Sequence, residues 1–226
     1  MSTGSMNPSA TVLVIGAGPG VGAAVARRFA REGLDVALVG ERGPRLDDLG
    51  RELTAEGLDV RWAGADLTDP DELTEVVGRL AAPRVGVLHF NPSAWREKDP
   101  LELSPAELLA DVHLGVGALL TAVQAARPSL HAGARITATG SIAADKPWHR
   151  AASLGVQKAG LRNLVHSIDA TLAPDGVRAV SVTVRGALAH DDPSSPFHPD
   201  RVAEAVHAAA HQDETRWRTE VGHPAS

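Results

Sequence analysis

The regular structure of the chain begins with TVLVIGAGPGVG at residues 11–22. Residues 11–16 form a short apolar, mostly β-branched run, which is typical of a strand buried on both faces of a sheet. Glycines then allow a tight turn, and residues 21–31 have helical spacing. A strand, a glycine-rich turn and a helix in this order direct free backbone N–H groups at a bound phosphate. The residues expected to bind a dinucleotide pyrophosphate are Gly16, Gly18, Pro19, Gly20, Val21 and Gly22.

Strand-like and helical segments alternate along the rest of the chain. The further expected strands are 35–40, 59–63, 85–90, 134–139 and 177–184, and the further helices are 44–56, one opening at Asp69-Pro70, 104–126, 151–172 and 199–211. This alternation predicts a parallel sheet with right-handed crossovers and helices on both faces. The expected fold is α/β, a single doubly wound Rossmann domain over residues 11–226 with six to seven strands. Residues 1–10 are expected to be a disordered or artificially added N-terminal tail.

Composition excludes several classes of function. The chain has 226 residues, a formal net charge of −6, no cysteine and no tyrosine. The missing cysteine rules out disulfides and zinc–thiolate sites, and it fits a cytoplasmic protein. The acidic balance without a basic block argues against a nucleic-acid partner. The polar N-terminus does not resemble a secretory signal, and no continuous apolar run reaches the ~20 residues of a membrane span.

Further motifs extend the pattern set by the glycine turn. Asp66-Leu67 follows the third expected strand, Asn91-Pro92 the fourth and Ser141 the fifth, while Lys158 lies on the next helix. Together with the spacing of the glycines, these motifs resemble the short-chain dehydrogenase/reductase family over residues 11–212. The resemblance implies that Asp66 and Leu67 contact the adenine and that Asn91 and Pro92 border the cofactor. It also implies that Ser141 and Lys158 are catalytic, and that Lys158 binds the nicotinamide ribose.

Two positions of the resembled catalytic set have changed. The tyrosine position, four residues before Lys158, is Leu154, and the asparagine position is His113. Leucine cannot transfer a proton, so we expect another group, His113 or His149, to serve as acid and base. The resemblance then implies an NAD(P)-dependent oxidoreductase acting on a small-molecule carbonyl or alcohol. Two alternatives stay open: a non-redox enzyme such as a dehydratase, isomerase or cyclase, and an inactive NAD(P)-binding protein.

The choice of cofactor depends on the end of the second strand. Glu41 stands 19 residues after Gly22, where a carboxylate binds the ribose hydroxyls of NAD and repels the extra phosphate of NADP. Arg42 follows directly and is able to pair with that phosphate. We expect NAD or NADP, with NAD slightly favoured.

The resemblance also implies a homodimer or homotetramer formed through the helices near 104–127 and 151–172. The second of these helices carries a broad apolar stripe of Leu161, Leu164, Val165, Ile168 and Leu172. Substrate specificity is expected in segments 92–100, 142–153 and 187–199, with Trp95 and Trp148 lining a pocket. No metal site is expected: His207 and His211 are four residues apart with Glu204 nearby, and we interpret them as a solvated helix face.

Overall fold

The computed structural model describes residues 10–224. The expectation for residues 1–9 therefore lies outside the described residues. Ala10, which the sequence places in the tail, belongs to the domain instead: it is buried, and its carbonyl accepts a hydrogen bond from the N–H of Asp35. The domain therefore includes Ala10, one residue before the boundary that the composition indicates.

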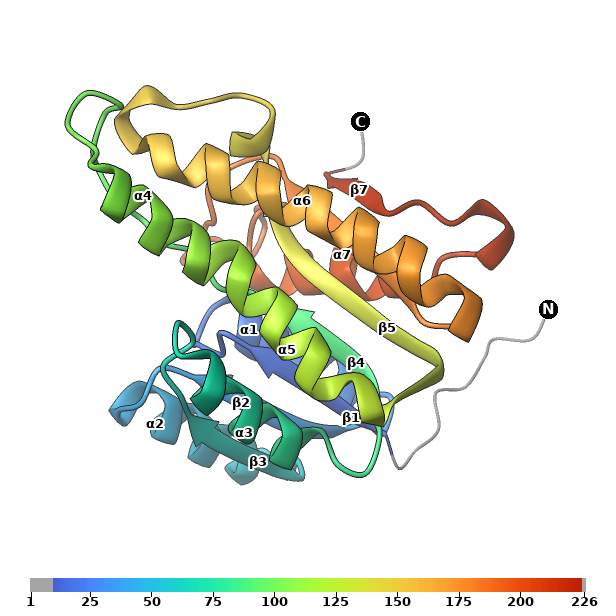
Figure 1. Cartoon of the computed structure of the whole chain (residues 1–226). Coiled ribbons are helices and arrows are strands. Elements are labelled where there is room, and N and C mark those ends of the chain that lie inside the picture. Colours follow the sequence, from blue (N-terminus) through green and yellow to red (C-terminus); the bar gives the residue numbers. More distant parts are fainter. Residues whose placement is uncertain (1–9, 225–226) are drawn as a thin grey trace.

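A seven-stranded parallel sheet forms the centre of the molecule (Figure 1). Its order is β3-β2-β1-β4-β5-β6-β7, and each pair of neighbours is parallel. The strands are β1 (Thr11–Ile15), β2 (Asp35–Gly40), β3 (Val60–Gly64), β4 (Val85–Phe90), β5 (Leu130–Ser141), β6 (Arg178–Val184) and β7 (Glu220–His223). The order reverses between β1 and β4, and at such a point the loops after the two strands separate and leave a crevice for a ligand.

Helices cover both faces of the sheet, as the alternation of elements predicts. The helices are α1 (Val21–Ala30), α2 (Pro44–Ala55), α3 (Pro70–Ala81), α4 (Pro105–Val112), α5 (Ala118–Ala126), α6 (Ala152–Leu172) and α7 (Pro199–Ala210). One apolar core lies between the sheet and α3, α5 and α6, and the second lies between the sheet and α1, α2 and α7. In Figure 1, α5 and α6 lie in front of the sheet, and α1 and α7 lie behind it. The doubly wound Rossmann fold is confirmed.

Helix starts follow from local chemistry that the sequence displays. The Asp69 side chain accepts hydrogen bonds from the backbone N–H groups of Asp71 and Glu72 at the start of α3. Pro70, the first helical residue, has no N–H group that would need a partner. Ser104 and Glu107 form a reciprocal capping box at the start of α4. These caps start α3 and α4 at fixed residues, and this in turn sets the lengths of the loops that follow β3 and β4.

The structure departs from the expected elements in three places. The expected helix 104–126 is interrupted at His113–Gly117 by a π-helical turn, which contains two glycines. The fifth strand begins at Leu130 rather than 134, because Leu130 pairs with Val85 before the register shifts. The seventh strand, Glu220–His223, is short and polar and has no apolar pattern to reveal it; it forms by pairing with β6.

The apolar stripe predicted to meet a partner subunit is used inside the chain. Leu161, Val165, Ile168 and Leu172 are buried in the core against the sheet, and Leu164 is partly buried beside them. The stripe is broad because α6 packs against both the sheet and α4, so it does not by itself indicate a subunit interface.

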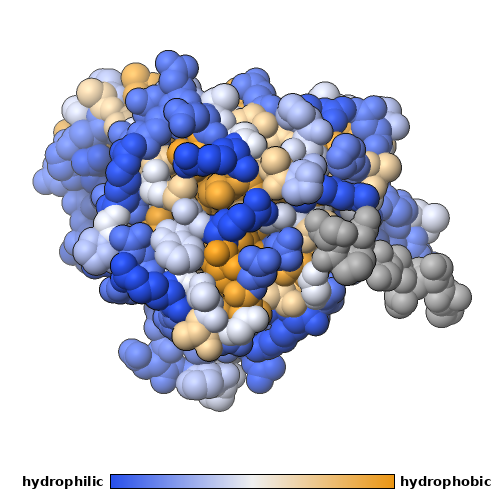
Figure 2. Space-filling model, turned by 90° about the horizontal axis from the view of Figure 1, so that it is seen from below, coloured by the Kyte–Doolittle hydropathy of each residue, from blue (hydrophilic) through white to orange (hydrophobic). Residues whose placement is uncertain are grey.

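The helical stretch Pro105–Ser129 is long and apolar enough to cross a membrane by length and composition alone. A helix of a soluble core passes the same test, and Leu119, Ala122 and Ala126 of this stretch pack in the core. Figure 2 shows a mainly hydrophilic face of the molecule, with a hydrophobic area near its centre that hydrophilic side chains cross.

Candidate active site

The glycine turn after β1 is held tightly against the loop after β4. The N–H groups of Gly16 and Ala17 both donate to the carbonyl of Val39, at 2.8 and 2.9 Å. Gly16 has a φ of +76°, and a Cβ placed there would lie 2.7 Å from Cγ of Pro92. Position 16 therefore requires glycine for both its conformation and its space.

At Gly18 the turn faces open space. A Cβ on Gly18 would meet no heavy atom of the described residues within 4 Å. Helix α1 starts directly after Gly20, and a glycine at this position has no side chain to cap the first N–H groups. The N–H of Ala23 donates back to the carbonyl of Gly18 at 3.0 Å, whereas those of Val21 and Gly22 make no such bond within the described residues and are able to bind an anion.

The turn opens into a cleft of about 750 Å³ at the carboxyl ends of the first four strands. The cleft is lined by Gly16, Ala17, Glu41, Arg42, Ala65, Asp66, Leu67, Thr68, Asn91, Pro92, Ser93 and Leu114. The structure thus brings together seven of the predicted cofactor residues: Gly16, Glu41, Arg42, Asp66, Leu67, Asn91 and Pro92. A cleft of this size that begins at a helix N-terminus, with both polar and apolar lining residues, fits a dinucleotide.

Arg42 is engaged by a carboxylate. Its guanidinium forms an ion pair with Glu72 of α3, and its side chain crosses Gly64, where a Cβ would lie 2.5 Å from the Arg42 Cγ. Glu41 lines the cleft next to it and is exposed. The sequence offered no signal for the Glu72 contact, because the two residues are 30 positions apart.

Asp66 is held in its ionised form at the floor of this cleft. Its Oδ1 accepts hydrogen bonds from the Thr68 hydroxyl at 2.7 Å and the Thr68 N–H at 2.8 Å. These bonds lower the pKa of the Asp66 carboxyl, and Arg42 and His113 lower it further through their charges. Asp66 is thus an acceptor-only group, suited to the amino and hydroxyl donors of a nucleoside.

A buried hydrogen-bonded chain positions Asn91. The Thr139 hydroxyl donates to Oδ1 of Asn91 at 2.8 Å, and the Asn91 amide donates to the Gly16 carbonyl at 3.4 Å. His89 joins Thr139 and Thr137 through its two ring nitrogens. Burial lowers the pKa of His89 to about 3, and the Lys158 charge acts in the same direction, so the ring is neutral. Our sequence analysis overlooked this chain, although a histidine in the apolar strand 85–90 was a visible signal.

Lys158 lies buried at the centre of the site. Its Nζ donates to the carbonyl of Pro92 at 3.2 Å and to that of Thr139 at 3.0 Å. Burial lowers the pKa of Lys158 to about 8. The preceding residue, Gln157, donates to the carbonyl of Ala94 and accepts from its N–H, both at 3.0 Å. Two neighbouring residues of α6 therefore fix the loop after β4 over the cleft.

The other predicted catalytic residues are less closely joined. Ser141 ends β5, and its Oγ accepts the N–H of Ala143 at 3.2 Å. His113 is exposed on the π-helical turn, where its ring lies over Gly117. Within residues 10–224, no hydrogen bond joins His113 or His149 to Ser141 or Lys158. Leu154, at the tyrosine position, is half-buried one helical turn before Lys158.

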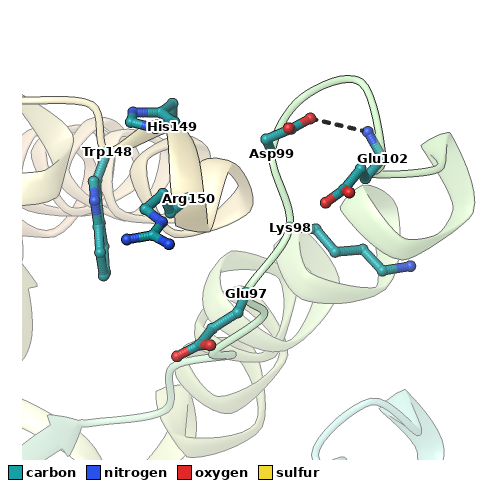
Figure 3. Close-up of a pocket in the computed structure, with 7 residues that line it drawn as sticks. All are labelled: Glu97, Lys98, Asp99, Glu102, Trp148, His149 and Arg150. Carbon is teal, nitrogen blue, oxygen red and sulfur yellow. Dashed lines mark hydrogen bonds between the residues drawn. The ribbon is translucent and has the colours of Figure 1, made fainter.

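A second pocket of about 410 Å³ lies between the loop after β4 and the start of α6 (Figure 3). It is lined by Glu97, Lys98, Asp99, Glu102, Trp148, His149 and Arg150. Figure 3 shows the Arg150 guanidinium pointing toward the space between Trp148 and Glu97. Trp148 lines this pocket, as expected, whereas Trp95 is not among its lining residues. The ring centroids of the two tryptophans lie 5.4 Å apart. His149 belongs to this pocket rather than to the larger cleft.

The loop after β6 reaches the glycine turn. A Cβ on Gly20 would lie 2.8 Å from Cε1 of His190, so this imidazole covers the turn directly. A backbone bond from the N–H of Ala189 to the carbonyl of Phe197 closes the base of the loop. The sequence marked residues 187–199 as a segment for substrate specificity, and only the structure shows that His190 lies beside Gly20.

Comparisons with known proteins agree with this geometry. A family model described as short chain dehydrogenase matches residues 10–189. The chain belongs to the short-chain dehydrogenase family. It is 30% identical over 215 residues to a cis-4-hydroxycyclohexanecarboxylate dehydrogenase of Sinomonas cyclohexanicum, with 86% of each chain covered. It is also 31% identical to sulfoacetaldehyde reductase 2 of Chromohalobacter salexigens, over 76% of this chain and 70% of the relative.

Solved structures of short-chain dehydrogenases share the fold. A metagenomic short-chain oxidoreductase in complex with NADP is 26% identical and superposes with a TM-score of 0.80, covering 98% of this chain and 99% of the other. A short-chain dehydrogenase from Mycobacterium smegmatis, at 22% identity, superposes with a TM-score of 0.82 over 98% of this chain and 94% of the other.

Because Lys158 is buried, the free energy of unfolding of this short-chain dehydrogenase should change with pH in the alkaline range. Its folded pKa of about 8 lies below the ordinary 10.5, so the unfolded chain binds more protons between these values. The free energy of unfolding should therefore rise from pH 8 to pH 10.5, with this residue contributing up to roughly 3 kcal/mol. The contribution is absent below pH 8, where both states are protonated.

Urea unfolding of the wild type and Lys158→Met across this range measures the effect. The background is small, because the chain has no tyrosine or cysteine and its other lysines are Lys98 and Lys146. In Lys158→Met the free energy of unfolding should no longer rise between pH 8 and pH 10.5, whereas in Lys146→Met it should rise as in the wild type. An equal rise in wild type and Lys158→Met would contradict the assignment.

Proposed function

We propose that the chain is an NAD(P)-dependent oxidoreductase that interconverts a small carbonyl compound and its alcohol. The observation that carries the proposal is the cleft that runs from the glycine turn to Pro92, with the buried Nζ of Lys158 on the Pro92 carbonyl. The residues proposed to hold the dinucleotide are Gly16, Gly18, Pro19, Gly20, Val21, Gly22, Glu41, Asp66, Leu67, Asn91, Pro92 and Lys158. A bound nicotinamide supplies or accepts the hydride.

NAD is the cofactor that the charges favour. Glu41 is exposed at the wall of the cleft and has the acceptor oxygens that two ribose hydroxyls need. A phosphate on the same ribose would lie beside this carboxylate and would be repelled. Arg42 is the neighbouring cation that could pair with this phosphate, but its guanidinium is already paired with Glu72.

Binding of NADH and NADPH, followed by fluorescence, tests the preference. We expect the wild type to bind NADH at least about tenfold more tightly. Glu72→Gln should release Arg42 and raise NADPH affinity severalfold with little change for NADH, and Glu75→Gln on the same helix is the control. Tighter NADPH than NADH binding by the wild type would contradict the assignment.

For the proton we propose Lys158 in place of the missing tyrosine. An acid with a pKa near the working pH is an efficient donor, and burial brings the Lys158 ammonium into this range. Two of its three N–H groups are directed at the carbonyls of Pro92 and Thr139, and the third remains for the substrate oxygen or a bridging water. Leu154 is shorter than tyrosine and leaves room for such a water. Ser141 is proposed to donate its hydroxyl proton in a hydrogen bond to the same oxygen.

The two histidines stay candidates for this role, and the contacts support them less. His113 contributes its charge to the environment of Asp66 in the cofactor cleft, and it lies on a turn whose next residue, Leu114, lines that cleft. His149 lines the separate pocket of Trp148 and Arg150. Neither histidine is buried as Lys158 is, because both side chains are exposed.

Two substitutions at position 154 test the proton donor. Leu154→Phe fills the space of the proposed water without supplying a proton, and we expect kcat to fall at least tenfold. Leu154→Tyr, its matched control, restores a phenol one turn from Lys158 and should keep or raise kcat. The assay follows nicotinamide absorbance with a panel of small cyclic ketones, because the exposed Trp95 and Trp148 rings, tilted by 46° to each other, offer apolar surface to a substrate ring.

The same assay separates the alternatives. Wild-type reduction should fall as pH rises above 8, and His113→Ala and His149→Ala should retain most of the activity. A large loss in either histidine variant would move the proton donor to that residue. Conversion of a substrate without any change in nicotinamide absorbance would favour a non-redox enzyme, and cofactor binding with no turnover would favour an inactive binding protein.

We also propose that two chains pair through α4, α5 and α6. Leu109, Leu120 and Val156 lie on these helices with 67%, 43% and 50% of their surface exposed, although they are large and apolar. Light scattering at micromolar concentration should give a mass of at least two chains. A single-chain mass would contradict this pairing, and Leu109→Lys together with Leu120→Lys should produce one.

A further inference from the structure

Three metal-ligating side chains meet at the C-terminal ends of α1 and α7, at the opposite end of α1 from the glycine turn. Glu32 lies in the turn after α1, and His207 and His211 lie one turn apart at the end of α7. One ligand atom from each of the three lies within 4.8 Å of the other two. Helix spacing brings Glu204 near the two histidines, but the carboxylate that contacts both of their rings is that of Glu32. Arg28 pairs with both Glu204 and Glu32.

We propose that Glu32, His207 and His211 form a binding site for a divalent transition-metal ion of the zinc type. Two imidazole nitrogens and one carboxylate oxygen are ligands that zinc accepts, with a water completing a tetrahedron. This inference concerns a surface separate from the proposed active site and does not depend on it.

The spacing of the donor atoms suits a single ion. Nε2 of His211 lies 3.5 Å from Oε2 of Glu32, and His207 Nε2 contacts the other carboxylate oxygen. Zinc bonds of about 2.0–2.1 Å in a tetrahedron separate neighbouring ligands by roughly 3.3 Å. The three side chains therefore need only small rotations to share an ion, and the partial exposure of Glu32 and His211 leaves a position for water.

The rings are held in place before any ion binds. Nδ1 of His211 donates to the backbone carbonyl of His207 at 2.8 Å, which leaves the Nε2 lone pair free and directed toward Glu32. Such a second bond commonly orients a metal-binding histidine. Phe29 packs against both rings, with centroid distances of 5.3 Å to His207 and 6.2 Å to His211.

Arg28 competes with the ion. Its guanidinium donates to Nδ1 of His207 at 3.0 Å, which places the ring proton on Nε2, where it faces Glu32. Metal binding at Nε2 requires this proton to move to Nδ1, and Arg28 must then withdraw from the ring. When Arg28 leaves His207, its guanidinium stays bonded to Glu204, to which it donates at 2.8 Å. Removing Arg28 should therefore strengthen metal binding.

An ion at this site would join the end of α1 to the end of α7. The same two helices pack along their length, and α1 begins at the glycine turn. Binding to the folded chain alone stabilises it. Zinc should thus raise the melting temperature without being needed for folding.

The experiment uses the full chain without a histidine tag, zinc chloride as the probe, and both calorimetry and thermal melting. We expect one zinc ion per chain and a rise in Tm of about 5 °C when zinc exceeds Kd by about a hundredfold. Glu32→Gln and His211→Asn should each weaken zinc binding at least tenfold, and Arg28→Ala should strengthen it. Magnesium, which prefers oxygen ligands, should have no effect.

His166→Asn, an exposed histidine on α6, is the matched control and should bind zinc like the wild type. The proposal is overturned if the folded wild type shows no zinc binding, or if Glu32→Gln and His211→Asn bind zinc as the wild type does. Weaker binding by Arg28→Ala would contradict the competition by Arg28. The variants' own melting curves without zinc show that they are folded.

Discussion

The buried ammonium of Lys158 is the contact on which the arrangement of the active site depends. Its Nζ joins the carbonyl of Pro92, after β4, to the carbonyl of Thr139, at the end of β5. Pro92 in turn packs on Gly16, so the lysine indirectly sets the width of the cleft at the glycine turn. A charge removed from water needs such partners, and the lowered pKa records how incompletely two carbonyls replace the solvent.

The substrate side has diverged further than the cofactor side. Gly16, Asp66 and Asn91 keep the contacts that a dinucleotide cleft requires, and a hydrogen-bonded chain through Thr139 and His89 supports Asn91 from within the sheet. At position 154, a leucine stands where a short-chain dehydrogenase has its tyrosine. Because the phenol is absent and the lysine is retained, we propose that the Lys158 ammonium takes over proton transfer.

The fold and the cofactor cleft were predictable because their signals are local. The glycine turn follows an apolar run, and Glu41, Asp66 and Asn91 each come directly after a strand, so a parallel sheet brings them to one edge. The pairing of Arg42 with Glu72 and the cluster of Glu32 with His207 join elements that are distant in sequence, and no local pattern reports them. The surroundings of His113 depend on a π-helical turn, and the stripe on α6 was misinterpreted because the packing of that helix is a property of the whole fold.

Calorimetric titration of the wild type and Lys158→Met with NADH tests the central claim most directly. The account predicts one NADH per chain for the wild type and affinity at least about tenfold lower for the variant, because the lysine holds the Pro92 loop and is proposed to contact the cofactor. If none of NAD, NADH, NADP and NADPH binds the folded wild type, the cleft is not a working cofactor site and the proposed oxidoreductase activity is wrong.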